Sequence, residues 1–323
     1  MIKRRLFAVG LVAAPFVNPA FAQAWQPSGP IKMVVAYPAG GPTDAIARIV
    51  AADISGPLGQ QVVVENVSGA SGAIGTRAVA KAKPDGLTIT IGNNQTHGNN
   101  MFMLTEPGYD AIKDFAPLAG AGAFEHVFVV RNGLPVKTIP ELIALAKQKP
   151  GQIHYGTSGI GAAGHVNVAL LETMADIKLA PVHYRGATPA LNDVIAGHIM
   201  LTSVSLSSSV PPYKAGHAKM LGTGGLKRLP ELPEVPAIAE TVPGYEAITW
   251  FGLFTTNGTP PAVIGKINAE VQKVFADPAF RERYITPNLF ETMTSSPEQF
   301  AEFIRTDSVK WAKVIRDANI KAD

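Results

Sequence analysis

Three glycine-rich segments carry the chemistry that this sequence offers most clearly. They are residues 37–44 (YPAGGPTD), 66–75 (NVSGASGAIG) and 155–165 (YGTSGIGAAGH). Glycine lets backbone N–H groups approach a ligand closely, and a helix that starts behind such a loop adds unpaired N–H donors with a partial positive charge. Loops of this kind bind anions, and none of the three contains Lys or Arg. The sequence therefore predicts a compact anion held by neutral donors, with a carboxylate as the first choice.

Each loop stands between a strand pattern and a helix pattern. Apolar runs predict strands, and apolar residues at helical spacing predict helices, in regular alternation. The expected strands are 31–36, 61–65, 87–92, 127–130, 152–155, 180–184, 199–204, 218–222 and 250–256. The expected helices are 43–58, 73–83, 138–148, a helix ending at 175, 188–196, 211–215 (a short helix or turn), 260–275, 278–284 and 297–315. This alternation indicates α/β architecture with parallel strands.

The pattern restarts near residue 127 and ends with a strand and helices that return to the first half. We expect domain I to comprise residues 23–125 plus 252–323 and domain II to comprise 126–251, with strands that cross between them near 124–130 and 249–256. In open α/β sheets the ligand lies beyond the carboxyl ends of the strands. Since all three loops follow strands, they are expected to face one another across a cleft between the domains.

The N-terminus has the pattern of an export signal. Residues 3–5 are basic, residues 6–17 are apolar, and Ala20-Phe21-Ala22 gives a cleavage site, so a signal peptide of residues 1–22 is expected. The apolar stretch is shorter than the ~20 residues that a membrane-spanning helix needs, which disfavours an anchor. Arg4-Arg5 leaves twin-arginine export open beside the general route. The predicted location is the periplasm.

The composition excludes several classes of function. Of 28 Lys+Arg and 25 Asp+Glu, three basic residues and no acidic ones fall in the signal, which leaves 25 of each. No basic stripe indicates nucleic acid binding, and without cysteine there is neither a disulfide nor a thiolate. The seven His show no tight metal-ligand spacing. We predict no metal, no cofactor and no nucleic-acid partner, and a monomer.

Together, the motifs of the mature chain resemble the Bug receptors, the extracytoplasmic solute-binding proteins of tripartite tricarboxylate transporters. The resemblance rests on YPAGGPTD (37–44), Asn66 with GASGAIG (69–75), PDG (84–86), YD and KDF (109–115), YGTSG with His165, YRG with PA and Asp193 (184–193), Arg228 with LPEVP (232–236), and PGYE (243–246). It implies a bilobed type II periplasmic-binding-protein fold, with two Rossmann-like domains joined by crossing strands. It also implies a carboxylate ligand, delivered to membrane permease subunits. Met200, where members often have Asp, and the polar segment 95–100 depart from the family pattern.

The expected ligand contacts come from five strand ends. They are Tyr37, Gly40, Gly41, Pro42, Thr43, Asn93, His97, Thr157, Ser158, Gly159, His165, Tyr184, Arg185, Ser203 and Ser205. Asp44 is expected to start a helix rather than to meet an anion. Arg185 could pair with a second ligand carboxylate or form a structural ion pair with Asp193, and both alternatives stay open. Asn94, next to Asn93, could also reach the cleft, whereas Trp250 and Phe251 are expected in the core more than at a cavity wall.

Two other functions compete with a transport receptor. Residues 159–164 form a literal G-x-G-x-x-G, but the next strand ends in Val182-His183-Tyr184-Arg185 without the acid that binds a ribose, so only an NADP-dependent oxidoreductase would fit. A periplasmic sensor for a signalling system would use the same pocket as a transport receptor. No G-x-S-x-G hydrolase motif is present, and the prediction is a binding protein rather than an enzyme.

Overall fold

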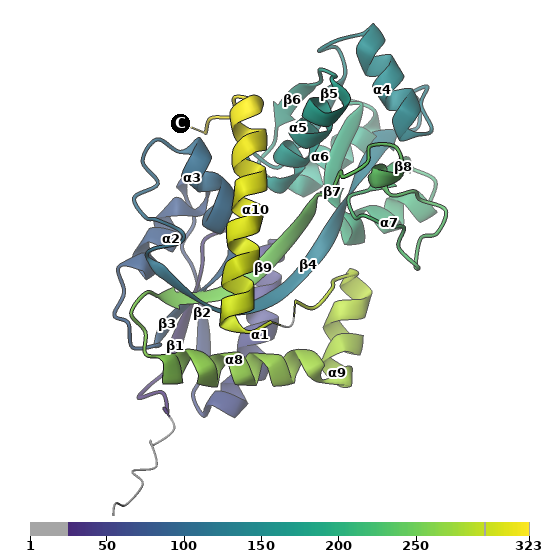
Figure 1. The fold of residues 1–323 in the computed structure, drawn as a ribbon. Coiled ribbons are helices and arrows are strands. Elements are labelled where there is room, and N and C mark those ends of the chain that lie inside the picture. The colour runs from purple at the N-terminus through teal and green to yellow at the C-terminus, as the bar shows by residue number, and fades with distance from the viewer. Residues whose placement is uncertain (1–24, 294, 323) are drawn as a thin grey trace, which may run out of the picture.

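The computed structural model describes residues 25–293 and 295–322. The expected export signal, residues 1–22, lies outside the described residues. The chain forms a mixed α/β structure whose strands are connected in the order β2-β1-β3-β9-β4-β7-β5-β6, with β8 paired to β4 (Figure 1). None of the helices in the described part of the chain has the length and apolar character to span a membrane.

The first group of strands is parallel. It consists of β1 (Ile31–Val35), β2 (Val62–Asn66) and β3 (Thr88–Asn93), with β1 between the other two. Its helical segments are α1 (Pro42–Leu58), η1 (Ala70–Gly72), α2 (Ala73–Ala80), η2 (Gln95–Asn99) and α3 (Asn100–Met103). The apolar run of β1 is buried along almost its whole length, as expected for a strand covered on both faces.

The second group repeats this arrangement. In it β5 (His154–Thr157) pairs in parallel with β6 (Ala180–His183) and β7 (Leu201–Ser205), and β8 is Ala218–Thr223. Its helices are α4 (Ile139–Gln148), α5 (Ala163–Ala175), α6 (Ala187–Ala196), α7 (Leu206–Lys214) and η3 (Ile238–Glu240). Helix α7 begins five residues before the expected segment 211–215, because its first turn is a serine-rich stretch without helical apolar spacing.

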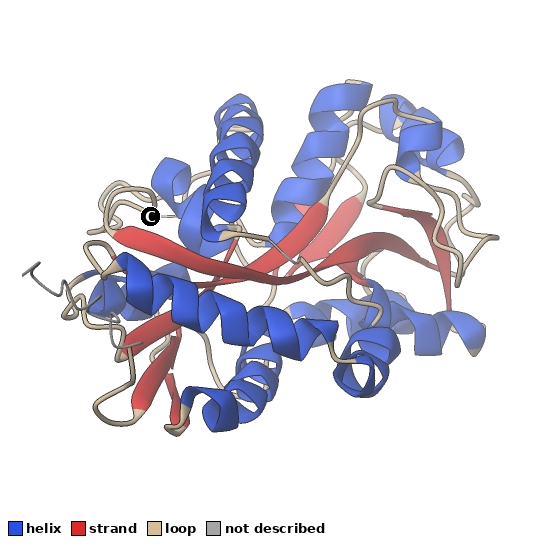
Figure 2. Cartoon of the chain, turned by 60° about the horizontal axis from the view of Figure 1, so that its bottom comes forward, coloured by secondary structure: helices blue, strands red, loops and turns tan. Residues whose placement is uncertain are grey.

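Two long antiparallel strands, β4 (Phe115–Arg131) and β9 (Ile248–Thr256), join the groups (Figures 1 and 2). The first nine residues of β4, 115–123, were not expected as a strand, because glycine, alanine and proline dominate them. Gly120 is required by close packing, since a Cβ there would lie 2.6 Å from the carbonyl oxygen of Met293. The domain boundaries expected from the sequence stay a prediction.

The C-terminal segment packs against both groups of strands. It contains α8 (Pro261–Ala276), α9 (Pro278–Phe280), η4 (Arg281–Ile285), η5 (Thr286–Asn288) and α10 (Pro297–Asp317). Phe300 and Ile304 of α10 lie in a core cluster with Trp250 and Phe254 of β9. Trp311, further along the same helix, belongs to the core of the second group. Helix α10 is therefore a third element that bridges the groups (Figure 1).

Candidate ligand-binding site

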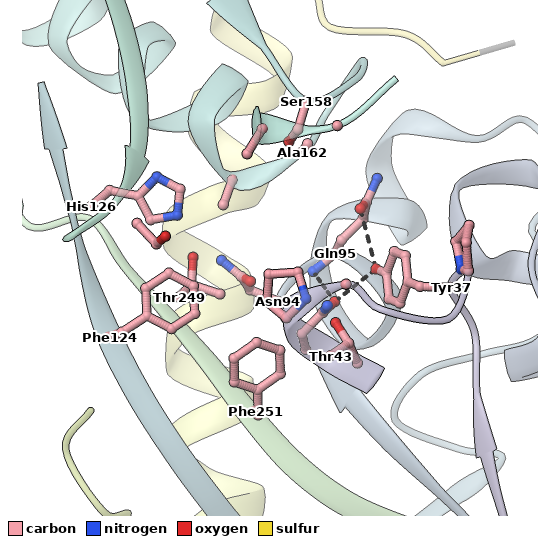
Figure 3. Close-up of a pocket in the computed structure, with 18 of the residues that line it drawn as sticks. Tyr37, Thr43, Asn94, Gln95, Phe124, His126, Ser158, Ala162, Thr249 and Phe251 are labelled. Atoms are coloured by element: carbon pink, nitrogen blue, oxygen red, sulfur yellow. Dashed lines mark hydrogen bonds between the residues drawn. The ribbon is translucent and has the colours of Figure 1, made fainter. Parts of the chain in front are cut away.

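A cavity of about 600 Å³ lies where the strand ends of both groups meet β4 and β9. Its walls come from the β1–α1 loop, the segment after β3, the β5–α5 and β6–α6 loops, the end of β7, and the two long strands (Figure 3). The lining residues are Tyr37, Pro38, Ala39, Gly40, Gly41, Pro42, Thr43, Asn93, Asn94, Gln95, Phe124, His126, Ser158, Ala162, Ala163, Arg185, Gly186, Ala187, Ser205, Thr249 and Phe251. None of these described residues is Asp or Glu.

The β1–α1 loop is held by a buried carboxylate beneath it. Asp44 accepts hydrogen bonds from the Gly40 N–H (2.9 Å), Arg48 Nε (3.0 Å) and Asn66 Nδ2 (2.9 Å). Burial alone would raise the pKa of Asp44, but the hydrogen bonds and the Arg48 charge outweigh it and lower the pKa to about 2. Asp44 thus organises the loop, as expected for a helix-start residue, and the Gly40 N–H is already engaged.

The start of α1 leaves other donors unused. Gly41 is the N-cap and Pro42 the first helical residue, and within residues 25–293 and 295–322 the N–H groups of Gly41, Thr43 and Asp44 have no hydrogen-bond partner. The Thr43 side chain is 6% exposed and faces the cavity. Free N–H groups at a helix start and a hydroxyl make an anion-binding surface without a cation.

Replacing Asp44 by Asn tests this loop through stability. At pH 7 the folded-state pKa depression predicts that Asp44→Asn lowers the free energy of unfolding by roughly 2 kcal/mol. Because the pKa of Asp44 is lower in the folded state, its carboxylate stabilises the fold fully when the pH is above the unfolded-state pKa near 4. This stabilisation is lost as the pH falls through the folded-state pKa of about 2. Urea unfolding at pH 7, 4 and 3 should therefore show that the difference in unfolding free energy between Asp44→Asn and the unmutated chain becomes smaller as the pH falls. Glu106→Gln, at an exposed loop position, is the control, and an Asp44→Asn difference that stays constant with pH would contradict the electrostatic explanation.

The β5–α5 loop faces the first loop with a second helix start. Ser158, Ala162 and Ala163 line the cavity, and the Ser158 and Ala163 N–H groups have no partner among the described residues. The middle glycine of the G-x-G-x-x-G, Gly161, is covered by Met103, whose sulfur would lie 2.0 Å from a Cβ there. This cover disfavours a dinucleotide pyrophosphate on the loop.

The β6–α6 loop supplies the one cationic side chain among the described lining residues, Arg185. The structural ion pair with Asp193 does not form, because Asp193 accepts the Tyr184 hydroxyl hydrogen bond at 2.6 Å and contacts His198 Nδ1 at 3.3 Å. The exposed Arg185 side chain has no ion pair within the described chain. It remains available to a ligand at the outer end of the cavity.

The back of the cavity is formed by one face of β4 and β9. Phe124 of β4 lies directly opposite Thr249 of β9, and His126 and Phe251 follow on the same face. Asn94, which follows β3, completes this wall (Figure 3). Burial lowers the pKa of His126 to about 4, so its ring is neutral at pH 7. We call these five residues the hinge wall.

The structure places nine of the fifteen expected residues along the cavity. They are Tyr37, Gly40, Gly41, Pro42, Thr43, Asn93, Ser158, Arg185 and Ser205.

The other six residues do not line the cavity; one of them is Gly159, and the five side chains of the rest have partners elsewhere. His97 is fully buried and stacks on Phe254, with 3.8 Å between ring centroids. The Thr157 hydroxyl bonds within its own turn to the Gly159 backbone, at 3.1 Å from the N–H and 3.0 Å from the carbonyl oxygen. His165 Nδ1 accepts a hydrogen bond from the Gly161 N–H, and the Tyr184 hydroxyl donates to Asp193. The Ser203 hydroxyl lies 3.4 Å from His126 Nδ1.

Sequence reasoning missed most of the hinge wall. Phe124, His126 and Thr249 are strand residues with no glycine or turn signal directly beside them, and Phe251, which precedes Gly252, was expected in the core. Their place at the cavity depends on how two distant strands pair. The polar segment 93–97 did give a signal, because Asn94 was considered beside Asn93 and His97 as a residue that could reach the cleft. The structure places Asn93, Asn94 and Gln95 along the cavity and buries His97.

Comparison with known proteins identifies the family. Residues 46–320 match the family described as the tripartite tricarboxylate transporter family receptor. The chain belongs to this family. A Pseudomonas sp. protein, described as a UPF0065 protein in the tcbD-tcbE intergenic region, is 36% identical to this receptor. The match covers 100% of this chain and 96% of the Pseudomonas protein.

Solved structures of relatives share the fold of this receptor. A structure described as R. palustris Rpa4515 with adipate has a TM-score of 0.82 and 33% identity, covering 91% of this chain and 99% of that one. MatC (Rpa3494) from Rhodopseudomonas palustris with bound malate has a TM-score of 0.79 and 27% identity, and the match covers 90% of this chain and 99% of MatC. The periplasmic binding protein BugD has a TM-score of 0.79 and 32% identity, and the match covers 91% of this chain and 99% of BugD. The expected bilobed periplasmic-binding-protein fold is thereby confirmed.

Proposed function

We propose that this receptor captures a small di-, tri- or aromatic carboxylate in the periplasm and delivers it to the membrane subunits of a tripartite tricarboxylate transporter. The observation that carries the proposal is the pair of helix starts, α1 and α5, whose unpaired N–H groups face one cavity without an acidic side chain among the described lining residues. Such a site compensates a carboxylate's charge with neutral donors. The adipate and malate bound by two relatives support the same ligand class.

The proposal includes export and binding without turnover. The pattern of residues 1–22 supports export. Among the described residues no group of three or more His, Cys, Asp or Glu is placed to hold a metal. The lobes are proposed to close around the ligand by bending at β4 and β9, a motion of the hinge class.

Titration calorimetry of the mature chain against mono-, di- and tricarboxylates, with aromatic acids included, tests the function. One or a few acids should bind with 1:1 stoichiometry, and their uncharged amide analogues should not. Small-angle scattering with the best ligand should show a smaller radius of gyration. A panel that gives neither heat nor a thermal shift would overturn the carboxylate proposal.

Arg185 is proposed to attract a carboxylate at the outer end of the cavity. Because an exposed ion pair contributes about 0.2–1 kcal/mol, Arg185→Ala should weaken dicarboxylates by up to about fivefold and monocarboxylates less. The salt dependence of dicarboxylate binding should also become weaker. Calorimetry at 20 and 200 mM salt measures both effects, with the exposed Arg305 of α10 replaced by Ala as control. Equal losses for both ligand types at every salt concentration would contradict this role.

A further inference from the structure

Two polar atoms of the hinge wall are buried without a hydrogen-bond partner. Asn94 is 2% exposed and Thr249 is 5% exposed, yet Asn94 Nδ2 and Thr249 Oγ1 contact no donor or acceptor in the described chain. Both residues line the cavity and are labelled in Figure 3, and β3, which Asn94 follows, pairs with β9, which carries Thr249. A buried polar group without a partner destabilises the free protein, and at a cavity wall a ligand atom can supply the missing hydrogen bond.

The hinge wall offers hydrogen bonds but no positive charge. Asn94 Nδ2 is a donor, the Thr249 hydroxyl can donate or accept, and the neighbouring His126 ring is neutral at pH 7. Arg185 follows β6, which is separated from β4 by β7 and β5. Three strand spacings put the backbones of β4 and β6 roughly 14 Å apart, so the Arg185 side chain would have to extend across the cavity to meet a group held at the wall. A second carboxylate buried there would lack a cation, which is costly, whereas an uncharged oxygen would be well matched.

Aromatic surfaces surround these polar atoms. The ring centroids of Phe124 and Phe251 are 5.7 Å apart, and Phe124 also stacks on His126 and on Phe290, each at 5.5 Å. Phe124 is 7% exposed and Phe251 is 2% exposed, and the small exposed part of each ring lines the cavity. Flat apolar surfaces of this kind favour contact with another ring through offset or edge packing.

We propose that the hinge wall selects an aromatic monocarboxylate that bears an uncharged oxygen, of the hydroxybenzoate class. This inference rests on the proposed function: the carboxylate lies between α1 and α5, the ring packs on Phe124 and Phe251, and the hydroxyl oxygen bonds Asn94 Nδ2 and Thr249 Oγ1. It narrows the ligand class to acids whose charge is at one end only.

Calorimetry with benzoate, 3- and 4-hydroxybenzoate, terephthalate and adipate tests the inference. The better hydroxybenzoate should bind at least tenfold more tightly than benzoate, terephthalate or adipate. Thr249→Val and Asn94→Leu keep the approximate shape and remove the polar atom. In each variant the affinity ratio of hydroxybenzoate to benzoate should fall from about tenfold to nearly one.

Thr255→Val is the matched control on the same strand. Thr255 is fully buried, and its hydroxyl donates to the Thr88 carbonyl oxygen at 3.1 Å, outside the cavity. It should lower the urea midpoint and leave the affinity ratio unchanged. Thr249→Val should not lower the midpoint, because its hydroxyl has no partner to lose.

The outcomes separate this inference from the proposed function. If terephthalate or adipate binds more tightly than either hydroxybenzoate, the hinge wall accepts a carboxylate and the inference fails while the carboxylate receptor stands. An unchanged affinity ratio in both Thr249→Val and Asn94→Leu would also overturn it. If no carboxylate binds at all, the proposed function itself fails.

Discussion

Replacing Thr43 by Asp should lower the affinity for every carboxylate ligand by roughly a thousandfold. The Thr43 side chain lies at the second position of α1 and faces the cavity, where the ligand carboxylate is proposed to bind. Two like charges about 4 Å apart repel by about 4 kcal/mol at the effective dielectric constant typical near a protein surface. An acidic residue in a first turn is favourable for the helix itself, so the variant should remain folded.

Thr43→Asn separates charge from shape in this experiment. It has the same size as Asp and no charge, so calorimetry should show a loss of about tenfold or less, consistent with one altered hydrogen bond. Circular dichroism and thermal unfolding should show that both variants fold. If Thr43→Asp binds the preferred ligand as tightly as Thr43→Asn does, the carboxylate does not bind at the start of α1.

The sequence predicts the outer part of the site because that part depends on local signals. Glycine, proline and a hydroxyl at the end of a strand specify a loop and a helix start within a few residues. Thr43 and Ser158 could therefore be placed at the cavity without knowledge of the fold. The same logic fails for Thr157, because the choice between two adjacent hydroxyls is decided by a turn in which Thr157 bonds Gly159.

The hinge wall lies beyond such reasoning for a physical reason. Phe124 and Thr249 become neighbours only through the antiparallel register of β4 and β9, which are far apart in sequence. The alternation of side chains along those strands then decides which residues face the cavity. Thr249 and Phe251 face it, while Trp250 between them is fully buried on the opposite side with Phe300 of α10.

The side of β9 away from the cavity is connected to α10 by a half-buried carboxylate. Asp307 accepts hydrogen bonds from Trp250 Nε1 at 2.7 Å and from Trp311 Nε1 at 2.9 Å. Burial raises the pKa of Asp307 above its usual range, although both indole hydrogen bonds oppose this. Strand β9 and the bridging helix α10 are thereby joined behind the wall that is proposed to contact the ligand.

Replacing Trp311 by Ala should be the most destabilising of the substitutions considered. The side chain is 1% exposed and packs in the core of the second group. Truncating a buried Trp to Ala lowers the free energy of unfolding by about 3–5 kcal/mol, through lost burial and the cavity left behind. Urea unfolding measures this loss, and Val309→Ala, at a position of the same helix that is 72% exposed, should change stability by no more than about 0.5 kcal/mol.

Hydrogen exchange distinguishes a loosened helix from a general loss of stability. If Trp311 attaches the end of α10 to the second group, Trp311→Ala should increase exchange first in the last turns of α10 and in the neighbouring α5. The amides of β1 and β3 should retain protection up to the reduced global stability, because α10 reaches the first group through Phe300 and Ile304 instead. A loss of unfolding free energy below about 1 kcal/mol, or equal acceleration of exchange in both groups of strands, would show that Trp311 does not attach α10 to the second group.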